Sequence, residues 1–166
     1  MADLRVGIGI DVHRFAAGRD LVLGGVTLRG EMGLLGHSDA DVLTHAVCDA
    51  VLGAAGLGDI GLHYPDSDER YRGISSLRLL VDVAAKLAAA GFAAENVDAT
   101  VLAERPRLAP HIPAMRTNLA RALGIAPERV NVKATTTETL GAVGRGEGMA
   151  AWATCLIRTA VPRPGT

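Results

Sequence analysis

The chain lacks most of the features that mark disulfide-stapled, membrane-spanning or nucleic-acid-binding proteins. Its two cysteines, Cys48 and Cys155, lie far apart and form no CxxC pair, so a disulfide framework is not indicated. We expect both to be small buried residues in a reducing compartment. The formal net charge of −1 provides no basic field to hold nucleic acid. An anionic substrate therefore has to be bound by local groups.

Long apolar runs are also missing, because a charge or a glycine cluster interrupts every apolar stretch. We therefore expect no transmembrane helix. Residues 1–5 lack the basic and apolar regions of a signal peptide, which favours a cytoplasmic protein with no membrane partner. Apolar residues nevertheless make up 49% of the 166 positions, enough for the core of one domain. We expect that domain over residues 1–159 and a C-terminal tail over residues 160–166.

The apolar periodicity predicts strands and helices without strict alternation. Strands are expected over residues 4–10, 97–103, 130–135 and 149–157, with a hairpin over residues 21–28 that turns at two glycines. Helices are expected over residues 38–53, 75–90 and 110–123. Residues 30–36, 56–73 and 141–148 are rich in glycine or turn formers. This mixture favours an α+β, two-layer domain, a mixed β-sheet with helices packed on one face.

One group of residues has the composition of a metal site. Asp11 and His13 follow the first expected strand two positions apart, and residues so spaced on an extended chain point the same way. With His45 they supply two imidazoles and one carboxylate, the ligand set of a catalytic zinc with a fourth position open. Asp41 and Asp49 share a helix face with His45, where a carboxylate can fix its tautomer. The alternative is a braced turn and a buried helix histidine.

Two further segments suit a phosphorylated or polyhydroxylated ligand. Ser38 is the expected cap of the helix that follows it, and a helix N-terminus with His37 beside it suits phosphate. The loop that contains Asp59 and residues 64–68 offers hydroxyls and carboxylates between glycines. Its alternative is an ordinary solvated turn.

The segment Ala134-Thr135-Thr136-Thr137-Glu138 combines hydroxyls with a carboxylate before a glycine-rich turn. Such a segment can bind a nucleotide phosphate and a hard cation such as Mg²⁺. The alternative is a β-rich threonine run. No Gly-Lys-Ser/Thr follows the glycines, and the chain contains no GxSxG. A nucleophile would then belong to the substrate or to water.

Six motifs occur in order along residues 6–157. They are Gly9-Ile10-Asp11-Val12-His13-Arg14-Phe15, Gly36-His37-Ser38-Asp39-Ala40-Asp41 with His45, Leu57-Gly58-Asp59-Ile60-Gly61 with Tyr64-Pro65-Asp66-Ser67-Asp68, Pro110-His111-Ile112-Pro113-Ala114-Met115-Arg116, Val132-Lys133-Ala134-Thr135-Thr136-Thr137-Glu138, and Gly144-Arg145-Gly146-Glu147-Gly148. Together they resemble the 2-C-methyl-D-erythritol 2,4-cyclodiphosphate synthase family of the non-mevalonate isoprenoid pathway.

The resemblance implies cyclisation of 4-diphosphocytidyl-2-C-methyl-D-erythritol 2-phosphate. In this family the 2-phosphate of the substrate attacks the β-phosphorus of the same molecule, and CMP leaves. The absence of an evident protein nucleophile agrees with such a reaction. Catalysis then consists of positioning and charge stabilisation, and well-oriented intramolecular attack can contribute roughly 7–11 kcal/mol.

The resemblance also implies roles for individual residues. It implies zinc ligands at Asp11, His13 and His45. Glu138 corresponds to the residue that holds a second cation, Mg²⁺ or Mn²⁺, on the substrate diphosphate. His37 and Thr136 correspond to residues that stabilise the transition state. The substrate-binding positions carried over are Ser38, Asp59, Ile60, Gly61, Tyr64, Pro65, Asp66, Ser67 and Asp68 for the methylerythritol side, and Ala103, Arg107, Leu108, Ala109, Ala134, Thr135 and Thr137 for the cytidine side.

The resemblance further implies a homotrimer with each active site between two subunits. Arg145 would then lie near the threefold axis, where some members bind an isoprenoid diphosphate. Two other functions remain open. A metal phosphohydrolase would use the same site with water as nucleophile, and a non-catalytic trimer would store or sense isoprenoid diphosphates.

Overall fold

The computed structural model describes residues 3–30 and 32–160, which form one main sheet and a small hairpin. The main sheet has five strands in the order β4-β1-β7-β5-β6. Only β5 and β6 run parallel, whereas the other neighbours run antiparallel, so the sheet is mixed. Its strands are β1 (Leu4–Ala17), β4 (Met32–Leu34), β5 (Phe92–Leu102), β6 (Val130–Thr135) and β7 (Gly148–Thr159). The hairpin pairs β2 (Leu21–Leu23) with β3 (Val26–Leu28).

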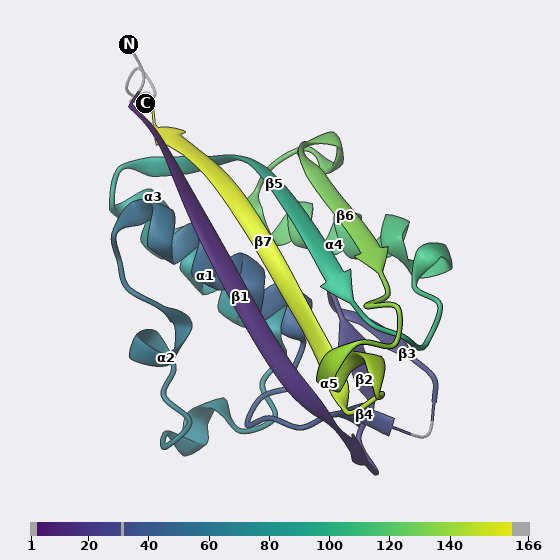
Figure 1. Ribbon diagram of the computed structural model, residues 1–166. Coiled ribbons are helices and arrows are strands. Elements are labelled where there is room, and N and C mark those ends of the chain that lie inside the picture. The colour runs from purple at the N-terminus through teal and green to yellow at the C-terminus, as the bar shows by residue number, and fades with distance from the viewer. Residues whose placement is uncertain (1–2, 31, 161–166) are drawn as a thin grey trace.

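Three long helices cover one face of the main sheet (Figure 1). They are α1 (Val42–Ala55), α3 (Ser76–Ala89) and α4 (Ile112–Leu123). Two short helices, α2 (Ile60–His63) and α5 (Gly141–Gly144), and the 3₁₀ turns η1 (Glu69–Tyr71), η2 (Ala109–His111) and η3 (Pro127–Arg129) lie in the connections. The predicted α+β fold, a mixed sheet with helices on one face, is confirmed.

Successive residues of β1 point to opposite faces of the sheet, so alternate positions of the strand face the helices. Gly7 and Gly9 face α1, and a Cβ at Gly9 would lie only 2.0 Å from the carbonyl oxygen of Ala46. The helix therefore rests directly on the strand at these glycines, because no side chain stands between them. Asp11 and His13 continue the same face by the period of two. This contact brings His45 of α1 beneath them.

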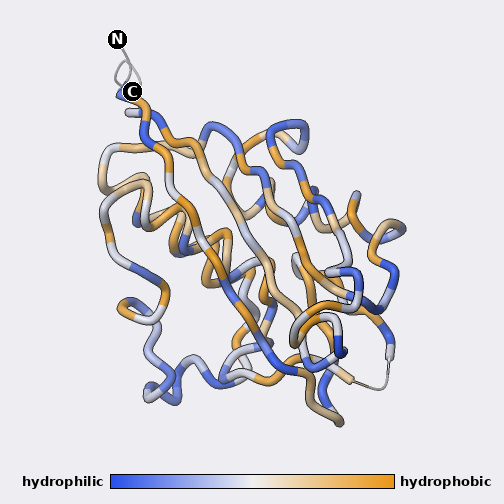
Figure 2. Tube along the Cα trace, viewed as in Figure 1, coloured by the Kyte–Doolittle hydropathy of each residue, from blue (hydrophilic) through white to orange (hydrophobic). Residues whose placement is uncertain are grey.

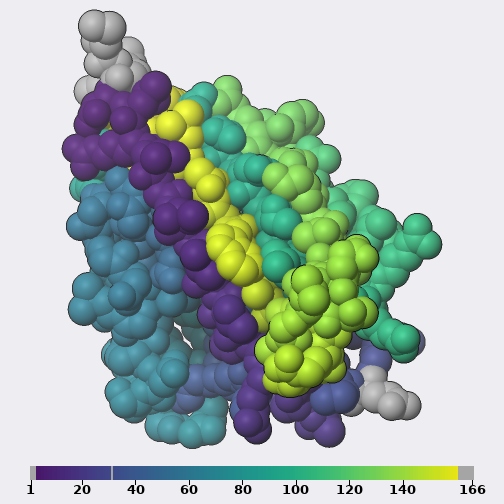
Figure 3. Space-filling view, in the orientation of Figure 1, coloured from purple at the N-terminus to yellow at the C-terminus, as the bar shows by residue number. Residues whose placement is uncertain are grey.

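The other face of the sheet carries apolar side chains that no helix covers. Val6, Ile8 and Val12 are 67%, 64% and 62% exposed. Figure 2 shows the hydrophobic stretch along β1, and Figure 3 shows β1, β7, β5 and β6 lying open at the front of the molecule. A soluble monomer seldom leaves such a contiguous apolar strip uncovered.

The two ends of the described chain lie together. Leu4 pairs with Arg158 where β1 begins and β7 ends. The Thr159 amide donates to the Asp3 carbonyl at 2.9 Å, and Figure 1 shows both ends at one corner. Most of the predicted tail, residues 161–166, lies outside the described residues. Among the residues that are described, no helix has the length and apolarity needed to cross a bilayer.

Three boundaries differ from the prediction by more than three residues. Strand β5 begins at Phe92, not at residue 97, because its first residues pair with the end of β7. The first strand continues past Ile10 to Ala17, because its second half pairs with the start of β7 and with β4. The first helix begins at Val42, not at Ser38, and Asp41 is its N-cap. The Asp41 carboxylate accepts hydrogen bonds from the Thr44 amide and hydroxyl. It therefore satisfies the helix start that Ser38 was expected to cap.

Candidate active site

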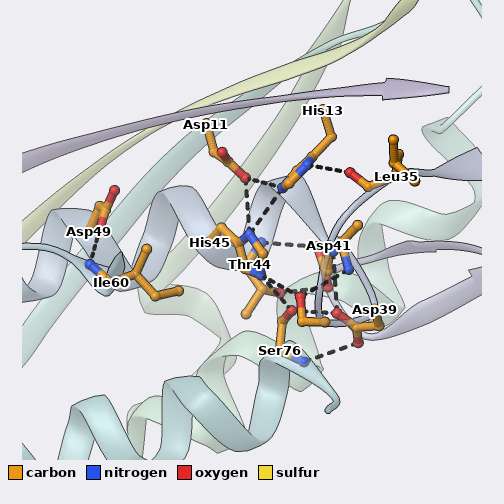
Figure 4. Close-up of polar contacts among 12 residues, drawn as sticks. Asp11, His13, Leu35, Asp39, Asp41, Thr44, His45, Asp49, Ile60 and Ser76 are labelled. Atoms are coloured by element: carbon orange, nitrogen blue, oxygen red, sulfur yellow. Dashed lines mark hydrogen bonds and ion pairs between the residues drawn. The ribbon is translucent and has the colours of Figure 1, made fainter. Parts of the chain in front are cut away.

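The predicted metal ligands Asp11, His13 and His45 lie together, and we call them the metal-ligand group. The Asp11 Oδ2 atom is 3.0 Å from His13 Nε2 and 3.1 Å from His45 Nδ1. The two imidazole nitrogens are 3.2 Å apart. Figure 4 shows Asp11 and His13 reaching from β1 toward His45 on α1. Among the described residues this is the one group of three or more His, Cys, Asp or Glu side chains so arranged.

These spacings fit a zinc ion. Zinc binds nitrogen and oxygen ligands at about 2.0–2.1 Å in a tetrahedron, whose edge is then about 3.3–3.4 Å. The three donor atoms, 3.0–3.2 Å apart, are close to one face of such a tetrahedron. All three residues also line one pocket. The residues therefore fit the ligand set of a catalytic zinc.

The outer nitrogens of the two histidines are also occupied. His13 Nδ1 lies 2.8 Å from the Leu35 carbonyl, which can only accept, so Nδ1 carries a proton and the lone pair of the neutral ring is at Nε2. His45 Nε2 lies 2.9 Å from the Ser76 hydroxyl and 3.1 Å from the Ser38 hydroxyl. In both rings the nitrogen that faces the centre of the group is the one free to bind a metal.

The contacts among Asp11, His13 and His45 shift the pKa values of Asp11 and His13. Burial raises the pKa of Asp11, but the hydrogen bonds and positive charges of His13 and His45 outweigh burial and hold that pKa well below its usual range. Burial lowers the pKa of His13, but the hydrogen bond and charge of Asp11 outweigh it and raise the pKa above the ordinary value. Asp11 is therefore ionised at neutral pH and attracts a cation, whether proton or metal.

The metal-ligand group lines a pocket of about 240 Å³. The structure brings several predicted substrate residues into it. The wall contains Gly36, His37, Ser38, Ile60, Gly61, Tyr64, Asp66, Tyr71 and Leu79. A larger hollow of about 760 Å³ lies elsewhere, beside Glu104 and Arg145. We take the smaller pocket as the candidate active site, because the metal-ligand group lines it and does not line the larger hollow.

Local contacts fix the loop that is predicted to bind the methylerythritol unit. Asp59 caps α2 and accepts from the Leu62 amide at 2.9 Å. His37 Nε2 lies 3.0 Å from the carbonyl of Asp68, which joins the two predicted segments. Tyr64 lines the pocket with its ring, because its hydroxyl donates to Asp82 at 2.6 Å. Pro65 and Ser67 are exposed at the tip.

One part of the prediction for His45 is wrong. Asp41 and Asp49 were expected to fix its tautomer, yet both bind other groups. The Asp41 carboxylate accepts from the amides of Gly24 and Gly25 at 2.9 and 2.8 Å. The Asp49 carboxylate accepts from the Ile60 amide at 2.7 Å and so anchors α2. The hydroxyls of Ser76 and Ser38 take the place at His45.

The remaining predicted residues form a second group at the ends of β5 and β6, which we call the β5–β6 group. It comprises Ala103, Arg107, Leu108, Ala109, Ala134, Thr135, Thr136, Thr137 and Glu138. The Thr136 hydroxyl donates to Glu138 at 3.0 Å, and Glu138 is exposed. The Glu104 carboxylate accepts from the Thr137 amide at 2.9 Å and holds this turn, in which Glu138 has a φ of 53°. None of these residues lines the pocket of the metal-ligand group.

The two groups lie far apart within one chain. Strand β6 is separated from β1 by β7 and β5. At about 4.8 Å per strand, three steps amount to roughly 14 Å. Glu138 lies in the turn beyond the end of β6, and it is not among the side chains that gather at the metal-ligand group. Arg145, near the second group, is exposed and paired with Glu147 at 2.6 Å.

Sequence reasoning missed Asp39, Ser76 and Glu104. The Asp39 carboxylate bonds to the Ser76 hydroxyl and amide, next to His45. Asp39 lies in one of the six motifs and Ser76 at the start of the helix expected over residues 75–90, but nothing in the sequence indicates that the two side chains are hydrogen-bonded. Glu104 carried no signal of its own.

A mixed-sheet α+β fold with an Asp-His-His metal-ligand group defines a candidate metalloenzyme. The family model described as the YgbB family matches residues 4–158. The chain belongs to this family. The resemblance inferred from the motifs is confirmed as well, because a curated relative from Desulforamulus reducens, "2-C-methyl-D-erythritol 2,4-cyclodiphosphate synthase", is 59% identical over 155 residues, 93% of this chain and 99% of that protein.

Solved structures agree with the fold. A structure described as 2C-methyl-D-erythritol-2,4-cyclodiphosphate synthase in a CDP-bound form is 36% identical with a TM-score of 0.84, over 92% of this chain and 99% of that one. The bifunctional IspDF from Campylobacter jejuni is 44% identical with a TM-score of 0.93, over 96% of this chain but 43% of that one.

Proposed function

We propose that this enzyme is a metal-dependent cyclase that converts 4-diphosphocytidyl-2-C-methyl-D-erythritol 2-phosphate to 2-C-methyl-D-erythritol 2,4-cyclodiphosphate and CMP in the non-mevalonate isoprenoid pathway. The observation that carries the proposal is the metal-ligand group, in a chain 59% identical over nearly its full length to a curated synthase of that name.

The reaction needs no protein nucleophile. An oxygen of the 2-phosphate forms a bond to the β-phosphorus of the same substrate. The bond from the β-phosphorus to the bridging oxygen breaks, and its electron pair leaves on the α-phosphate of CMP. The pocket's task is to hold the two phosphates in line.

The chain's own groups divide this task. Asp11, His13 and His45 would hold the zinc, which when bound supplies a Lewis acid for a diphosphate oxygen. His37 and Ser38 lie on the same wall and can donate to a phosphate. Ser38, Asp59, Ile60, Gly61 and residues 64–68 bind the methylerythritol unit. Thr136 would stabilise the transition state, and Glu138 would hold Mg²⁺ or Mn²⁺, which when bound supplies positive charge for the diphosphate.

Assembly brings the two groups together in this proposal. The metal-ligand group and the β5–β6 group are separated within one chain, so the cytidine side must come from a neighbouring copy. A homotrimer does this if the open face of the sheet lies at its centre. The exposed apolar strip of Val6, Ile8 and Val12 supports that arrangement. Arg145 would then lie near the threefold axis, where it could bind an isoprenoid diphosphate.

Location and extent belong to the same proposal. A cytoplasmic enzyme agrees with the two free, buried cysteines. We propose residues 1–159 as the single domain and residues 160–166 as a tail.

Phosphorus NMR of the purified protein with substrate, zinc and magnesium tests the reaction. CMP together with a cyclic diphosphate, lost on chelation, is the expected result. CMP together with a linear bisphosphate would instead indicate the phosphohydrolase. No reaction from a metal-loaded trimer would favour a protein that stores or senses isoprenoid diphosphates.

Replacing His45 by alanine tests the metal-ligand group. The variant should lose stoichiometric zinc because one of three protein ligands is gone. The matched control is His63→Ala, since His63 contacts the Leu57 carbonyl and lies outside the group. Zinc content by atomic absorption measures both, and a His45→Ala variant with full zinc and full turnover would refute the assignment.

A further inference from the structure

We propose that Asp39 and Ser76 are positioning residues that hold His45 in the tautomer required for metal binding through Nδ1. The inference rests on the proposed function only in taking Asp11, His13 and His45 as a metal site. It concerns two residues that belong neither to the metal-ligand group nor to the residues lining the pocket.

The contacts form a chain from the metal ligand His45 to the partly buried carboxylate of Asp39. His45 Nε2 lies 2.9 Å from Ser76 Oγ. The Ser76 hydroxyl bonds to Asp39 Oδ1, and the Ser76 amide donates to Asp39 Oδ2 at 3.0 Å. Ser76 is fully buried, so water does not compete for its hydroxyl. Figure 4 shows His45, Ser76 and Asp39 in this order, leading away from Asp11.

The direction of these hydrogen bonds follows from the donors and acceptors. An ionised carboxylate only accepts, so the Ser76 hydroxyl must give its proton to Asp39. Ser76 Oγ is then left with lone pairs toward His45, and Nε2 must carry a proton to bond with it. A neutral ring protonated at Nε2 has its lone pair at Nδ1, the atom that faces Asp11 and His13. The carboxylate thus sets the His45 tautomer through the intervening hydroxyl.

Asp39 is itself held in place by the surrounding chain. Its amide donates to the Ile74 carbonyl at 3.0 Å. Ser75, the N-cap of α3, makes no side-chain capping bond, and Asp39 meets the Ser76 amide at that helix start instead. The same carboxylate therefore fixes the start of α3 and orients a hydroxyl toward α1.

We call the hydrogen bonds from His45 to Ser76 and from Ser76 to Asp39 the relay. Replacing Asp39 by asparagine should reverse the direction of these hydrogen bonds. The asparagine oxygen can accept from the Ser76 amide only if its NH₂ group faces Ser76 Oγ. The hydroxyl proton is then free to point at His45 Nε2, which favours the tautomer protonated at Nδ1. Loss of an outer partner of a metal ligand typically costs about 10–100-fold in metal affinity, and we expect Asp39→Asn to fall in that range.

The decisive variant is the double substitution. Ser76→Ala should weaken metal binding less than Asp39→Asn, because the Ser38 hydroxyl, 3.1 Å from Nε2, remains as an acceptor. Adding Ser76→Ala to Asp39→Asn removes the wrongly directed hydroxyl. The double variant should therefore bind metal as well as Ser76→Ala alone, and better than Asp39→Asn. A purely structural role for Asp39 predicts instead that the two losses add.

The experiment measures Co²⁺ and Zn²⁺ affinity by competition with a chromophoric chelator for the full-length wild type and the three variants. Asp20→Asn, which removes the same charge at an exposed position, is the control and should leave affinity unchanged. Circular dichroism checks folding. Additive losses, or an Asp39→Asn affinity equal to that of the wild type, would overturn the relay. Turnover is scored separately, so a wild type that binds zinc without making the cyclic product counts against the proposed function alone.

A second measurement needs no carboxylate variant. In the zinc-loaded wild type, nitrogen-15 NMR should show a His45 Nε2 proton that exchanges slowly with water, and Ser76→Ala should speed that exchange. An Nε2 proton that exchanges equally fast in both proteins would contradict the contact with Ser76 even if the Asp39 variants failed to fold.

Discussion

Two aspartates near His45 show how the donors around a carboxylate decide its role. Asp41 is fully buried and binds the turn at Gly24–Gly25 while it caps α1. Asp49, eight residues along the same helix, binds the amide of Ile60 instead. Both lie at helical spacing from His45, yet neither side chain contacts it. Each carboxylate instead accepts hydrogen bonds from backbone amides, and helical spacing in the sequence does not predict those partners.

Replacing Asp41 by alanine should destabilise the fold strongly. The change removes the N-cap of α1 and leaves the buried amide of Gly24 and the partly buried amide of Gly25 without their acceptor. We expect a loss of roughly 2–4 kcal/mol in the free energy of unfolding. Chemical denaturation measures it, with Asp41→Asn as the milder control that keeps the capping oxygen. A loss below that of the control would contradict the role.

The two thiols should be inert in the native protein. Burial raises the pKa of Cys155 to about 12 and raises that of Cys48 well above the ordinary value. Only the thiolate reacts, and its fraction grows as the pH rises toward the pKa, so at pH 8 both thiols stay protonated. Ellman's reagent at pH 8 should report no fast thiol before denaturation and two afterwards. A fast native reaction would show that a cysteine is accessible.

At the scale of elements, the contact between β1 and α1 determines the metal-ligand group. Asp11 and His13 come from the strand and His45 from the helix, so their spacing depends on how closely the two approach. The glycines at positions 7 and 9 set that approach, because α1 lies against their bare backbone. Strand β4 adds a second constraint, since the chain that follows it presents the Leu35 carbonyl to His13.

Replacing Gly9 by alanine should therefore separate the strand from the helix. The new Cβ would lie 2.0 Å from a backbone oxygen of α1, and backbone cannot move aside as a side chain can. We expect a destabilisation of roughly 1–3 kcal/mol together with weaker zinc binding. The control is Gly53→Ala on α1, where the nearest atom is 3.9 Å away and the helix gains up to ~1 kcal/mol. Thermal unfolding and zinc titration measure both, and equal effects would refute the close-contact argument.

The elements themselves were largely predictable from periodicity. Every strand and helix long enough to show a repeating apolar pattern was found, including β7 and α3. The three-residue strand β4 was taken for part of a glycine-rich loop, because three residues carry no period. The far half of β1 was missed for a different reason. It exists because β7 and β4 pair with it, and pairing partners are not visible in a local window.

The site was predictable to the extent that it depends on residue type. Two histidines and an aspartate identify a metal site by composition, and the fold brought them together as expected. The partners of His45 could not be found this way. Ser76 lies 31 residues from its partner His45 along the chain. Asp39 lies 37 residues from Ser76, to which it is hydrogen-bonded. Such relations depend on tertiary packing rather than on any sequence spacing.

At the scale of the whole molecule, the predicted site residues of one chain form two separate groups. The metal-ligand group lies beneath β1, and the β5–β6 group lies across the sheet from it. The proposed trimer would join the metal-ligand group of one copy with the β5–β6 group of the next. Its formation should therefore be a condition of turnover and not of folding.

Replacing Ile8 by aspartate tests this separation. Ile8 is exposed on the open face of the sheet, so the monomer should fold normally. A charge there should shift the protein from trimer to monomer and abolish cyclase activity. The control is Val81→Asp, which places the same charge on the exposed side of α3, away from that face. Light scattering after size exclusion gives the assembly state, and an active monomeric Ile8→Asp variant would refute the shared site.

The meeting of the chain ends has a consequence for how the enzyme can be built into larger proteins. The first strand begins and the last strand finishes as hydrogen-bonded neighbours. From Leu4 the metal-ligand group starts seven residues along β1, roughly 23 Å away. A second enzyme joined at either end would lie away from the metal-ligand group. A short linker between the two ends would permit a circular permutant. Modular fusion is thus compatible with this fold without any change to its chemistry.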